Sequence, residues 1–243
     1  MDERFLRIEM LLGTSAMERL AAAHVCVLGL GGVGSWCAEA LARSGVGELT
    51  LMDQDKVELT NLNRQAQALT STLGLPKAEA LARRLSDISP GCRLHPVTGR
   101  YEPAVRENFF SVKYDYIVDA IDLVSCKLDL IETALARQVP ILSALGTGNK
   151  LDASALRVSD ISKTEGCPLA RVVRKELRAR GILHHKVVWS PEPAHASAQP
   201  ESPPPGRRSV PSSVMWVPAT AGLLLAGEVV LDLTAGLREG EPS

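Results

Sequence analysis

A glycine-rich run offers the clearest chemistry in this sequence: Gly29-Leu30-Gly31-Gly32-Val33-Gly34. It lies between an apolar stretch, residues 24–30, and a helical pattern, residues 33–43. Glycine allows a tight turn and lets backbone N–H groups approach phosphate oxygens, to which the N-terminus of a helix adds a positive end. Asp53 ends the next apolar run, where a carboxylate can hold ribose hydroxyls. These residues predict a nucleotide site formed by Gly29, Gly31, Gly32, Gly34 and Asp53.

Charged residues after Asp53 distinguish a triphosphate from a dinucleotide. Arg64 follows the second predicted strand and Lys77 begins a predicted helix, so both belong at the sheet edge where Asp122 follows a further strand. Arg64 and Lys77 can bind phosphate oxygens of a triphosphate, while Asp122 binds magnesium. Either cation on its own is better explained as a solvated surface charge, and only their joint occurrence favours ATP. The predicted cofactor site also includes Asp55, Asn61 and Lys127.

Two other classes of protein remain open at this point. An NAD-dependent oxidoreductase is supported by the glycine run and Asp53, but hydride transfer leaves Arg64, Lys77 and Asp122 unexplained. A non-catalytic scaffold that binds a nucleotide and passes sulfur or a protein partner along is the third reading. A glycine turn that serves only helix packing is the structural alternative to all three.

The elements that must position these residues alternate along the chain. Predicted strands at 24–30, 48–53, 93–97, 114–120 and 140–144 alternate with predicted helices at 33–43, 76–88 and 125–137. Strands separated by crossover helices pair in parallel, so we expect an α/β fold with a doubly wound, mostly parallel sheet of Rossmann-like type. Residues 1–150 form the predicted nucleotide-binding domain.

The remainder of the chain is predicted to complete the same domain. Strands at 155–159 and 186–189, a basic helix at 168–180 and a final helix at 219–233 form an additional C-terminal α/β segment, residues 151–190 and 214–243. The proline-rich residues 191–213 cannot bury enough surface to order themselves, so we predict a flexible loop. Residues 214–236 are apolar, but Pro218, Glu228 and Asp232 interrupt them. We therefore predict a core helix and no stable membrane span.

Composition excludes several functions. The 243 residues have a formal net charge of -1, so a polyanion would need a local basic patch. Aromatic residues make up 4%, which disfavours a platform of stacked rings for an oligonucleotide. Five cysteines form no C-x-x-C pair, which disfavours a zinc site. The charged N-terminus lacks an apolar leader core and predicts a cytoplasmic protein.

Taken in order, six motifs of the first 148 residues resemble the ubiquitin-activating-enzyme-like adenylyltransferase superfamily: Gly29–Gly34, Asp53, Asn61, Arg64-Gln65, residues 74–77 and residues 119–122. The resemblance implies that Asp53 holds ribose, that Asn61, Arg64 and Lys77 contact phosphates, and that Asp122 serves magnesium. It further implies that Arg7 reaches the other subunit's site as a catalytic residue, so that the enzyme is a homodimer. From the sequence alone, Arg7 is equally well explained as a solvated residue on an amphipathic helix.

The second half narrows the resemblance to the tRNA threonylcarbamoyladenosine dehydratase branch. The matching stretches are residues 43–47, 160–164, 168–175, 186–190, 217–218 and 221–222. This branch implies ATP-dependent cyclisation of threonylcarbamoyladenosine in tRNA through an acyl-adenylate. The alternative is adenylation of the C-terminal Gly-Gly of a ubiquitin-like or sulfur-carrier protein, against which the missing zinc pairs count. This chain departs from the branch at Cys167, where aspartate is expected, and in the length of residues 191–213.

A basic helix and the cysteines complete the set of predictions. Arg171, Arg174, Lys175 and Arg178 share one helix face and are predicted to bind the tRNA backbone, although a solvated helix face explains them equally well. Cys126 lies near the predicted site, but packing explains it better than reactivity. A transfer role for Cys167, with a cysteine desulfurase or sulfur-acceptor protein as partner, is the least favoured of these hypotheses.

Overall fold

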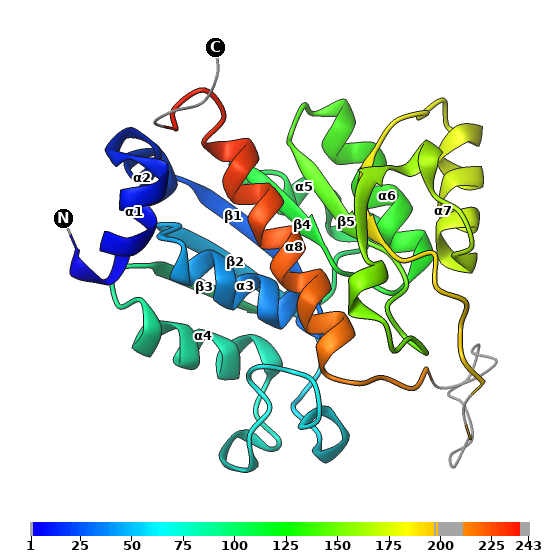
Figure 1. The fold of residues 1–243 in the computed structure, drawn as a ribbon, viewed down its shortest axis with the longest axis horizontal. Helices are drawn as coiled ribbons and strands as arrows, with labels where there is room; N and C mark the ends of the chain where they lie inside the picture. The colour runs from blue at the N-terminus through cyan, green and yellow to red at the C-terminus, as the bar shows by residue number, and fades with distance from the viewer. Residues whose placement is uncertain (1, 197, 199–210, 239–243) are drawn as a thin grey trace.

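A seven-stranded sheet forms the centre of the protein, in the order β3-β2-β1-β4-β5-β7-β6. The computed structural model describes residues 2–196, 198 and 211–238 (Figure 1). All neighbouring strands pair in parallel except β6 and β7, which are antiparallel. The strands are β1 His24–Leu28, β2 Glu48–Asp53, β3 Arg93–Thr98, β4 Tyr116–Asp119, β5 Ile141–Ala144, β6 Arg157–Asp160 and β7 Lys186–Trp189. The predicted α/β, doubly wound and mostly parallel fold is confirmed.

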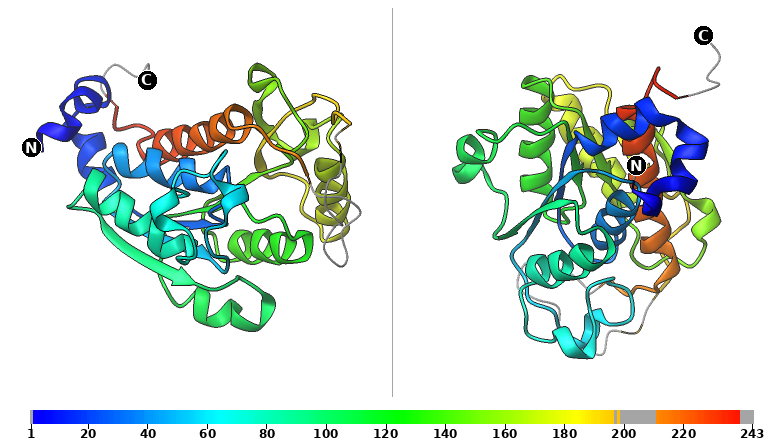
Figure 2. Two further views of the ribbon diagram at one scale, coloured as in Figure 1. Left: turned by 90° about the horizontal axis from the view of Figure 1, so that it is seen from below. Right: turned by 90° about the vertical axis from the view of Figure 1, so that its left-hand side faces the viewer.

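Helices cover both faces of the sheet, as Figure 2 shows. Alternate residues of one strand point to opposite faces, so Val25 and Val27 of β1 join one apolar core while Cys26 and Leu28 join the other. The first core packs against α2, α3, α4 and α8, and the second packs against α6 and α7. The helices are α1 Leu6–Leu12, α2 Thr14–Ala21, α3 Gly34–Arg43, α4 Lys77–Ile88, α5 Arg106–Phe109, α6 Val124–Ala136, α7 Pro168–Ala179 and α8 Trp216–Leu233.

The final helix, α8, packs on α3 as the predicted core helix. A Cβ atom on Gly222 would lie 2.4 Å from the carbonyl oxygen of Val33, so only glycine permits this approach of the two helices. Among the described residues, α8 is the one helix long and apolar enough to cross a membrane, and 56% of it is buried in the protein. Lys186 forms ion pairs with Glu228 and Asp232, which places the charged side of α8 beside β7.

The structure corrects the sequence prediction in three places. At the N-terminus there are two helices, α1 and α2, where the sequence indicated at most one amphipathic helix around Arg7. The first strand ends at Leu28 instead of residue 30, because Gly29 turns the chain with a φ of 83°. The ends of residues 191–213 are anchored instead of flexible: Glu192 hydrogen-bonds Leu151, and Ser212 hydrogen-bonds Asn149. Residues 197 and 199–210 of that prediction lie outside the described residues.

Candidate nucleotide-binding site

A cavity of about 750 Å³ opens at the carboxyl ends of β1, β2 and β4. In open α/β sheets this edge is where ligands bind, and the volume suits a nucleotide. The sequence-predicted residues that line it are Gly29, Gly31, Gly32, Gly34, Asp53, Asp55, Asn61, Arg64, Lys77 and Asp122. The structure therefore brings together residues that lie far apart in the chain, from the glycine run to the end of β4.

The glycine run fits tightly against the end of β4. A Cβ atom on Gly29 would lie 2.6 Å from the carbonyl oxygen of Ala120, and one on Gly34 would lie 1.9 Å from the carbonyl oxygen of Gly29. Gly31 differs, because a Cβ atom there would meet nothing within 4 Å. Gly29 and Gly34 are thus required by the fold, whereas Gly31 leaves open space in the cavity wall.

Asp53 is fixed to the glycine run by its own carboxylate. The backbone N–H of Leu30 donates to Oδ2 of Asp53 at 2.6 Å, and that of Asp55 donates to Oδ1 at 2.8 Å. Burial raises the pKa of the Asp53 carboxyl, while the nearby Lys77 opposes that shift. The carboxylate therefore joins the ends of β1 and β2 and faces the cavity between them. Its contact with ribose stays a prediction.

Lys77 presents a buried ammonium group at the start of α4. Pro76 occupies the N-cap position, and the Lys77 N–H donates to the carbonyl oxygen of Asp55 at 2.9 Å. The Nζ atom of Lys77 lies 2.9 Å from a carboxylate oxygen of Asp55, in an ion pair whose lysine side is 8% exposed and whose aspartate side is 57% exposed. This pair holds the cation against the cavity wall, where an incoming phosphate can compete with Asp55.

Arg64 and Asn61 lie on the short segment after β2. The Arg64 guanidinium donates to the carbonyl oxygen of Thr60 and to Oδ1 of Asn63, both at 2.9 Å. Burial lowers the pKa of this guanidinium, but arginine stays charged in proteins. Oδ1 of Asn61 accepts from the backbone N–H of Glu58 at 3.1 Å, which closes the turn. Trp36 of α3 fixes the same segment, because its indole N–H donates to the carbonyl oxygen of Arg64 at 2.8 Å.

Lys127 is not placed as predicted. Its side chain is fully buried, and its Nζ atom lies 2.6 Å from a carboxylate oxygen of Asp119 and 3.1 Å from the carbonyl oxygen of Ala144. It does not line the cavity. The prediction that Lys127 contacts the cofactor is therefore wrong, because the end of β4 supplies a buried carboxylate that binds the ammonium beneath the cavity floor.

The same carboxylate joins three neighbouring strands. Asp119 of β4 accepts the hydroxyl hydrogen of Ser143 of β5 at 2.6 Å, and the Ser143 oxygen lies 2.8 Å from Nε2 of His185, just before β7. Because the Ser143 hydroxyl donates to Asp119, its oxygen accepts from Nε2–H of a neutral His185. The other carboxylate oxygen of Asp119 accepts from the backbone N–H of Ile121 at 3.0 Å. This buried network holds the turn that carries Asp122 to the cavity rim.

Arg7 lies outside the cavity of its own chain. It is an exposed residue of α1, and α1 lies beside the beginning of β1, at the opposite end of that strand from the glycine run (Figure 1). The cavity lining does not include it. A role for Arg7 in this site would therefore require a second copy of the chain.

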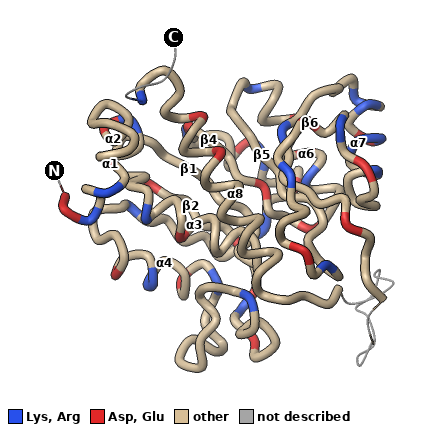
Figure 3. The backbone as a smooth tube through the Cα atoms, viewed as in Figure 1, with Lys and Arg blue, Asp and Glu red and all other residues tan. Residues whose placement is uncertain are grey.

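Basic residues are concentrated along α7, where Figure 3 colours the backbone blue at several positions. Arg171, Lys175 and Arg178 are exposed on this helix. Arg174 is used differently: its guanidinium donates to the carbonyl oxygen of Thr164 at 2.5 Å and to the hydroxyl of the same residue. Of the four residues predicted to bind tRNA, Arg174 is thus the one bound to the preceding loop, and the contact of this helix with tRNA stays a prediction.

All five cysteines are buried thiols. Burial raises the pKa of Cys126, so packing describes it better than reactivity, as predicted. Cys167 is the N-cap of α7, where its Sγ atom accepts from the backbone N–H of Ala170 at 3.5 Å. It thus occupies the capping position that an aspartate would take, and the transfer role considered for it has no support in this geometry.

Several residues of the cavity lining were not predicted from the sequence, and Thr147 and Tyr101 are two of them. Thr147 and Tyr101 line the cavity, the first from the loop after β5 and the second from the segment after β3. The signal for Thr147 was available, because it lies between Gly146 and Gly148 directly after a predicted strand at the same sheet edge. Tyr101 had no comparable signal.

A glycine run at a helix start, an acidic residue after the second strand and a cation-lined cavity define a nucleotide-binding protein of the doubly wound α/β class. The chain belongs to the ThiF family, whose profile matches residues 4–233. It is 40% identical over 242 residues to the tRNA threonylcarbamoyladenosine dehydratase of Bacillus subtilis, covering 96% of this chain and 95% of that protein. It is 42% identical over 177 residues to the Escherichia coli enzyme of the same name, covering 73% of this chain and 66% of that one. The crystal structure of E. coli tRNA N6-threonylcarbamoyladenosine dehydratase in complex with ATP superposes with a TM-score of 0.87 at 36% identity, covering 96% of this chain and 94% of that one.

Proposed function

We propose that this chain is an ATP-dependent tRNA threonylcarbamoyladenosine dehydratase that cyclises the modified base through an acyl-adenylate. The observation that carries the proposal is the convergence of Arg64, Lys77 and Asp122 on one cavity beside the glycine run. The identity with relatives of that name, over nearly the whole chain, supports the same substrate. Hydride transfer has no use for this set of charges. The proposed substrate also implies a cytoplasmic enzyme.

The proposed reaction overcomes the poor reactivity of a free carboxylate. The threonyl carboxylate attacks the α-phosphate of ATP, the bond to the β-phosphate breaks, and pyrophosphate leaves. A nitrogen of the neighbouring carbamoyl group then attacks the activated carbonyl carbon, AMP leaves with the bonding electrons, and the nitrogen loses its proton. The ring closure is intramolecular, so positioning supplies much of the rate and no protein nucleophile is needed. The buried state of all five thiols supports a route without cysteine.

Each residue of the cavity has a role in this scheme. The ammonium of Lys77 and the guanidinium of Arg64 stabilise the negative charge that moves onto the phosphate oxygens. Backbone N–H groups of the glycine run bind phosphate, because they lie at the N-terminus of α3, which is the positive end of that helix. Asp53 holds the ribose hydroxyls, and Asn61 closes the turn that places Arg64.

Magnesium fits the donor set of this site. Asp122 lies on the cavity rim and offers carboxylate oxygens, the ligands that this cation prefers. When bound, the ion would neutralise charge on the phosphate oxygens of the leaving pyrophosphate. The fixed turn between Asp119 and Asp122 holds the carboxylate at that rim.

In a homodimer, Arg7 of one copy would lie at the nucleotide site of the other copy. The helix α1 that carries Arg7 also exposes apolar side chains: Leu6 is 47% exposed, Met10 76% and Leu11 75%. Large apolar residues exposed together mark an interaction surface. We propose that this face packs against a second copy of the chain and delivers Arg7 to the phosphates of the partner's nucleotide.

Labelled-pyrophosphate exchange and tRNA analysis together test the proposal. The purified protein should catalyse magnesium-dependent exchange of pyrophosphate into ATP in the presence of tRNA bearing threonylcarbamoyladenosine. Mass spectrometry should then detect the cyclic base in that tRNA. Asp122→Ala and Lys77→Met should abolish both signals, and Lys113→Met, at an exposed lysine away from the cavity, should retain them. Exchange that requires a carrier protein ending in Gly-Gly, with tRNA unchanged, would replace the proposal by the alternative substrate. A cysteine desulfurase or sulfur-acceptor partner would belong to that alternative.

A further inference from the structure

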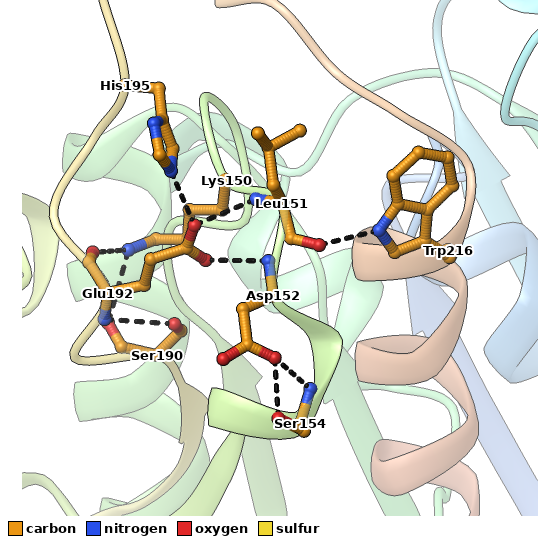
Figure 4. Close-up of polar contacts among 8 residues, drawn as sticks. All are labelled: Lys150, Leu151, Asp152, Ser154, Ser190, Glu192, His195 and Trp216. Carbon is orange, nitrogen blue, oxygen red and sulfur yellow. Dashed lines mark hydrogen bonds and ion pairs between the residues drawn. The ribbon is translucent and has the colours of Figure 1, made fainter.

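An exposed tryptophan lies at the start of α8. The Trp216 side chain is held by a hydrogen bond from its indole N–H to the carbonyl oxygen of Leu151 at 2.6 Å, as Figure 4 shows. Trp216 is nevertheless 53% exposed, and the adjacent Met215 and Leu151 are 45% and 52% exposed. The polar edge of the indole is thus satisfied within the protein, while much of its apolar surface faces solvent.

A buried polar network fixes the backbone to which Trp216 is bonded. Lys150 is 4% exposed, and its ammonium donates to the carbonyl oxygens of Ser190, at 3.3 Å, and Glu192. The Glu192 carboxylate accepts from the backbone N–H groups of Leu151, at 2.9 Å, and Asp152, at 3.1 Å (Figure 4). His195 lies 2.8 Å from the same carboxylate. These hydrogen bonds hold the loop after β5 in place, so the indole of Trp216, which is bonded to that loop, has a fixed orientation.

This tryptophan adjoins the mouth of the nucleotide cavity. Thr147, in the same loop as Leu151, lines the cavity. The chain just before Trp216 is bound next to the cavity, because the side-chain amide of Asn63, which precedes the lining residue Arg64, donates to the carbonyl oxygen of Ser213 at 3.0 Å. Just after Trp216, Pro218 lies 3.3 Å from a Cβ atom placed on Gly32. Trp216 does not itself line the cavity, but the residues before and after it contact Asn63 and Gly32, at or next to the cavity wall.

We propose that the indole of Trp216 is the stacking surface for a purine base of the tRNA, either the modified adenine or its neighbour in the loop. This inference rests on the proposed function. The substrate carboxylate is attached to an adenine, so a base must lie beside the α-phosphate during transfer. Unpaired bases of RNA bind proteins by stacking on aromatic rings, and a single ring with its polar edge already satisfied is suited to that contact. The low aromatic content excludes an extended platform, but one base requires one ring.

Three variants separate aromatic stacking from other roles of the side chain. Trp216→Phe keeps a ring, Trp216→Leu keeps apolar bulk without one, and Val112→Ala alters an exposed apolar residue that precedes β4. Stacking on an aromatic side chain contributes about 1–3 kcal/mol per base, so Trp216→Leu should raise the KM for modified tRNA roughly fivefold to 150-fold. Trp216→Phe should raise it only a few-fold, and Val112→Ala should leave it unchanged. The Kd for ATP should be the same in all three, which confirms that each variant is folded.

Tryptophan fluorescence gives an independent readout. Of the other two tryptophans, Trp189 is 5% exposed and Trp36 is half-buried, so the emission that Trp216→Phe removes belongs to an exposed indole. The tRNA that bears threonylcarbamoyladenosine should quench that emission in the wild type.

The possible results distinguish this inference from the proposed function. A wild type that cyclises tRNA, together with an unchanged KM in Trp216→Leu, refutes the stacking role and leaves the proposed function standing. A sedimentation coefficient that differs between Trp216→Leu and the wild type, together with wild-type fluorescence that RNA does not quench, would show that a second copy of the chain covers the ring and would also refute it. If the wild-type protein has no activity on tRNA, both the stacking role of Trp216 and the proposed function are refuted.

Discussion

Lys127→Met should destabilise the protein without weakening ATP binding. Lys127 and Asp119 are both fully buried, with 2.6 Å between the ammonium nitrogen and a carboxylate oxygen. Removal of one partner from a buried ion pair costs about 3–5 kcal/mol, because it leaves the other charge uncompensated. Ser143 and Ile121 continue to donate to Asp119, which favours the lower end of that range. We expect a loss of about 3 kcal/mol in the free energy of unfolding.

Chemical denaturation and calorimetry measure the two effects separately. For a protein of this size, 3 kcal/mol corresponds to a fall in Tm of roughly 6–12 °C. The Kd for ATP, measured below that temperature, should change little, because Lys127 does not line the cavity. Lys77→Met supplies the contrast: its ion pair with the largely exposed Asp55 contributes about 1 kcal/mol or less, yet its loss should weaken ATP binding strongly.

A second substitution tests the electrostatic explanation. Asp119→Asn in the Lys127→Met background removes the uncompensated carboxylate and should restore part of the lost stability. The reasoning would be refuted if Lys127→Met unfolded at the wild-type temperature while its affinity for ATP fell, since that result would place the ammonium on the nucleotide after all. Lys113→Met, at an exposed lysine, serves as the control for loss of a positive charge.

Three further predictions follow from the geometry. Gly31→Ala should fold but bind ATP more weakly by calorimetry, because its methyl group enters open space in the cavity wall, whereas Gly34→Ala should yield insoluble protein, because its methyl group meets the Gly29 carbonyl. Burial lowers the pKa of His185 to about 4 from 6.5, so the unfolded chain takes up the proton first as the pH falls. The contribution of His185 to stability should therefore be complete above pH 6.5 and be lost between pH 6.5 and 4. Urea denaturation should show this loss in the wild type and a smaller one in His185→Gln. All five thiols should resist modification in the native protein, and Cys167→Ser should retain activity, as a disulfide-exchange reagent and the tRNA assay can show.

The part of the fold that was predicted depends on local patterns. The strand at Glu48–Asp53 and the strand at Lys186–Trp189 have the predicted limits, because their apolar runs end at polar or turn-forming residues. The glycine run was placed correctly between a strand and a helix for the same reason. Parallel strands with crossover helices then leave few topologies, so the common edge that collects Asp53, Arg64, Lys77 and Asp122 follows from the order of elements.

The errors arose where a side chain is bound by a residue outside its own helix or segment. Lys127 resembles a surface cation, and only the pairing of β4 with β5 reveals that Asp119 and Ala144 surround it. Arg174 has the spacing of an exposed helix face, but the preceding loop folds back on it at Thr164. Glu192 belongs to a proline-rich segment, and its order comes from the buried Lys150, more than forty residues earlier. Neither the amino-acid composition nor the hydrophobic periodicity of the sequence reveals these contacts.

The packing of α8 on α3 has a consequence for biosynthesis. Within the described residues, every strand of the sheet and every residue that lines the cavity precedes Trp216 in the chain, whereas the most extensive helix contact of α3 is with α8. A nascent chain that still holds residues 216–233 inside the ribosome therefore leaves Cys37, Leu41 and the backbone around Val33 unprotected from water and from other chains. The glycine run at the start of α3 therefore packs against α8 only in the last stage of folding. Folding around the nucleotide cavity can accordingly be completed only after residues 216–233 have left the exit tunnel of the ribosome.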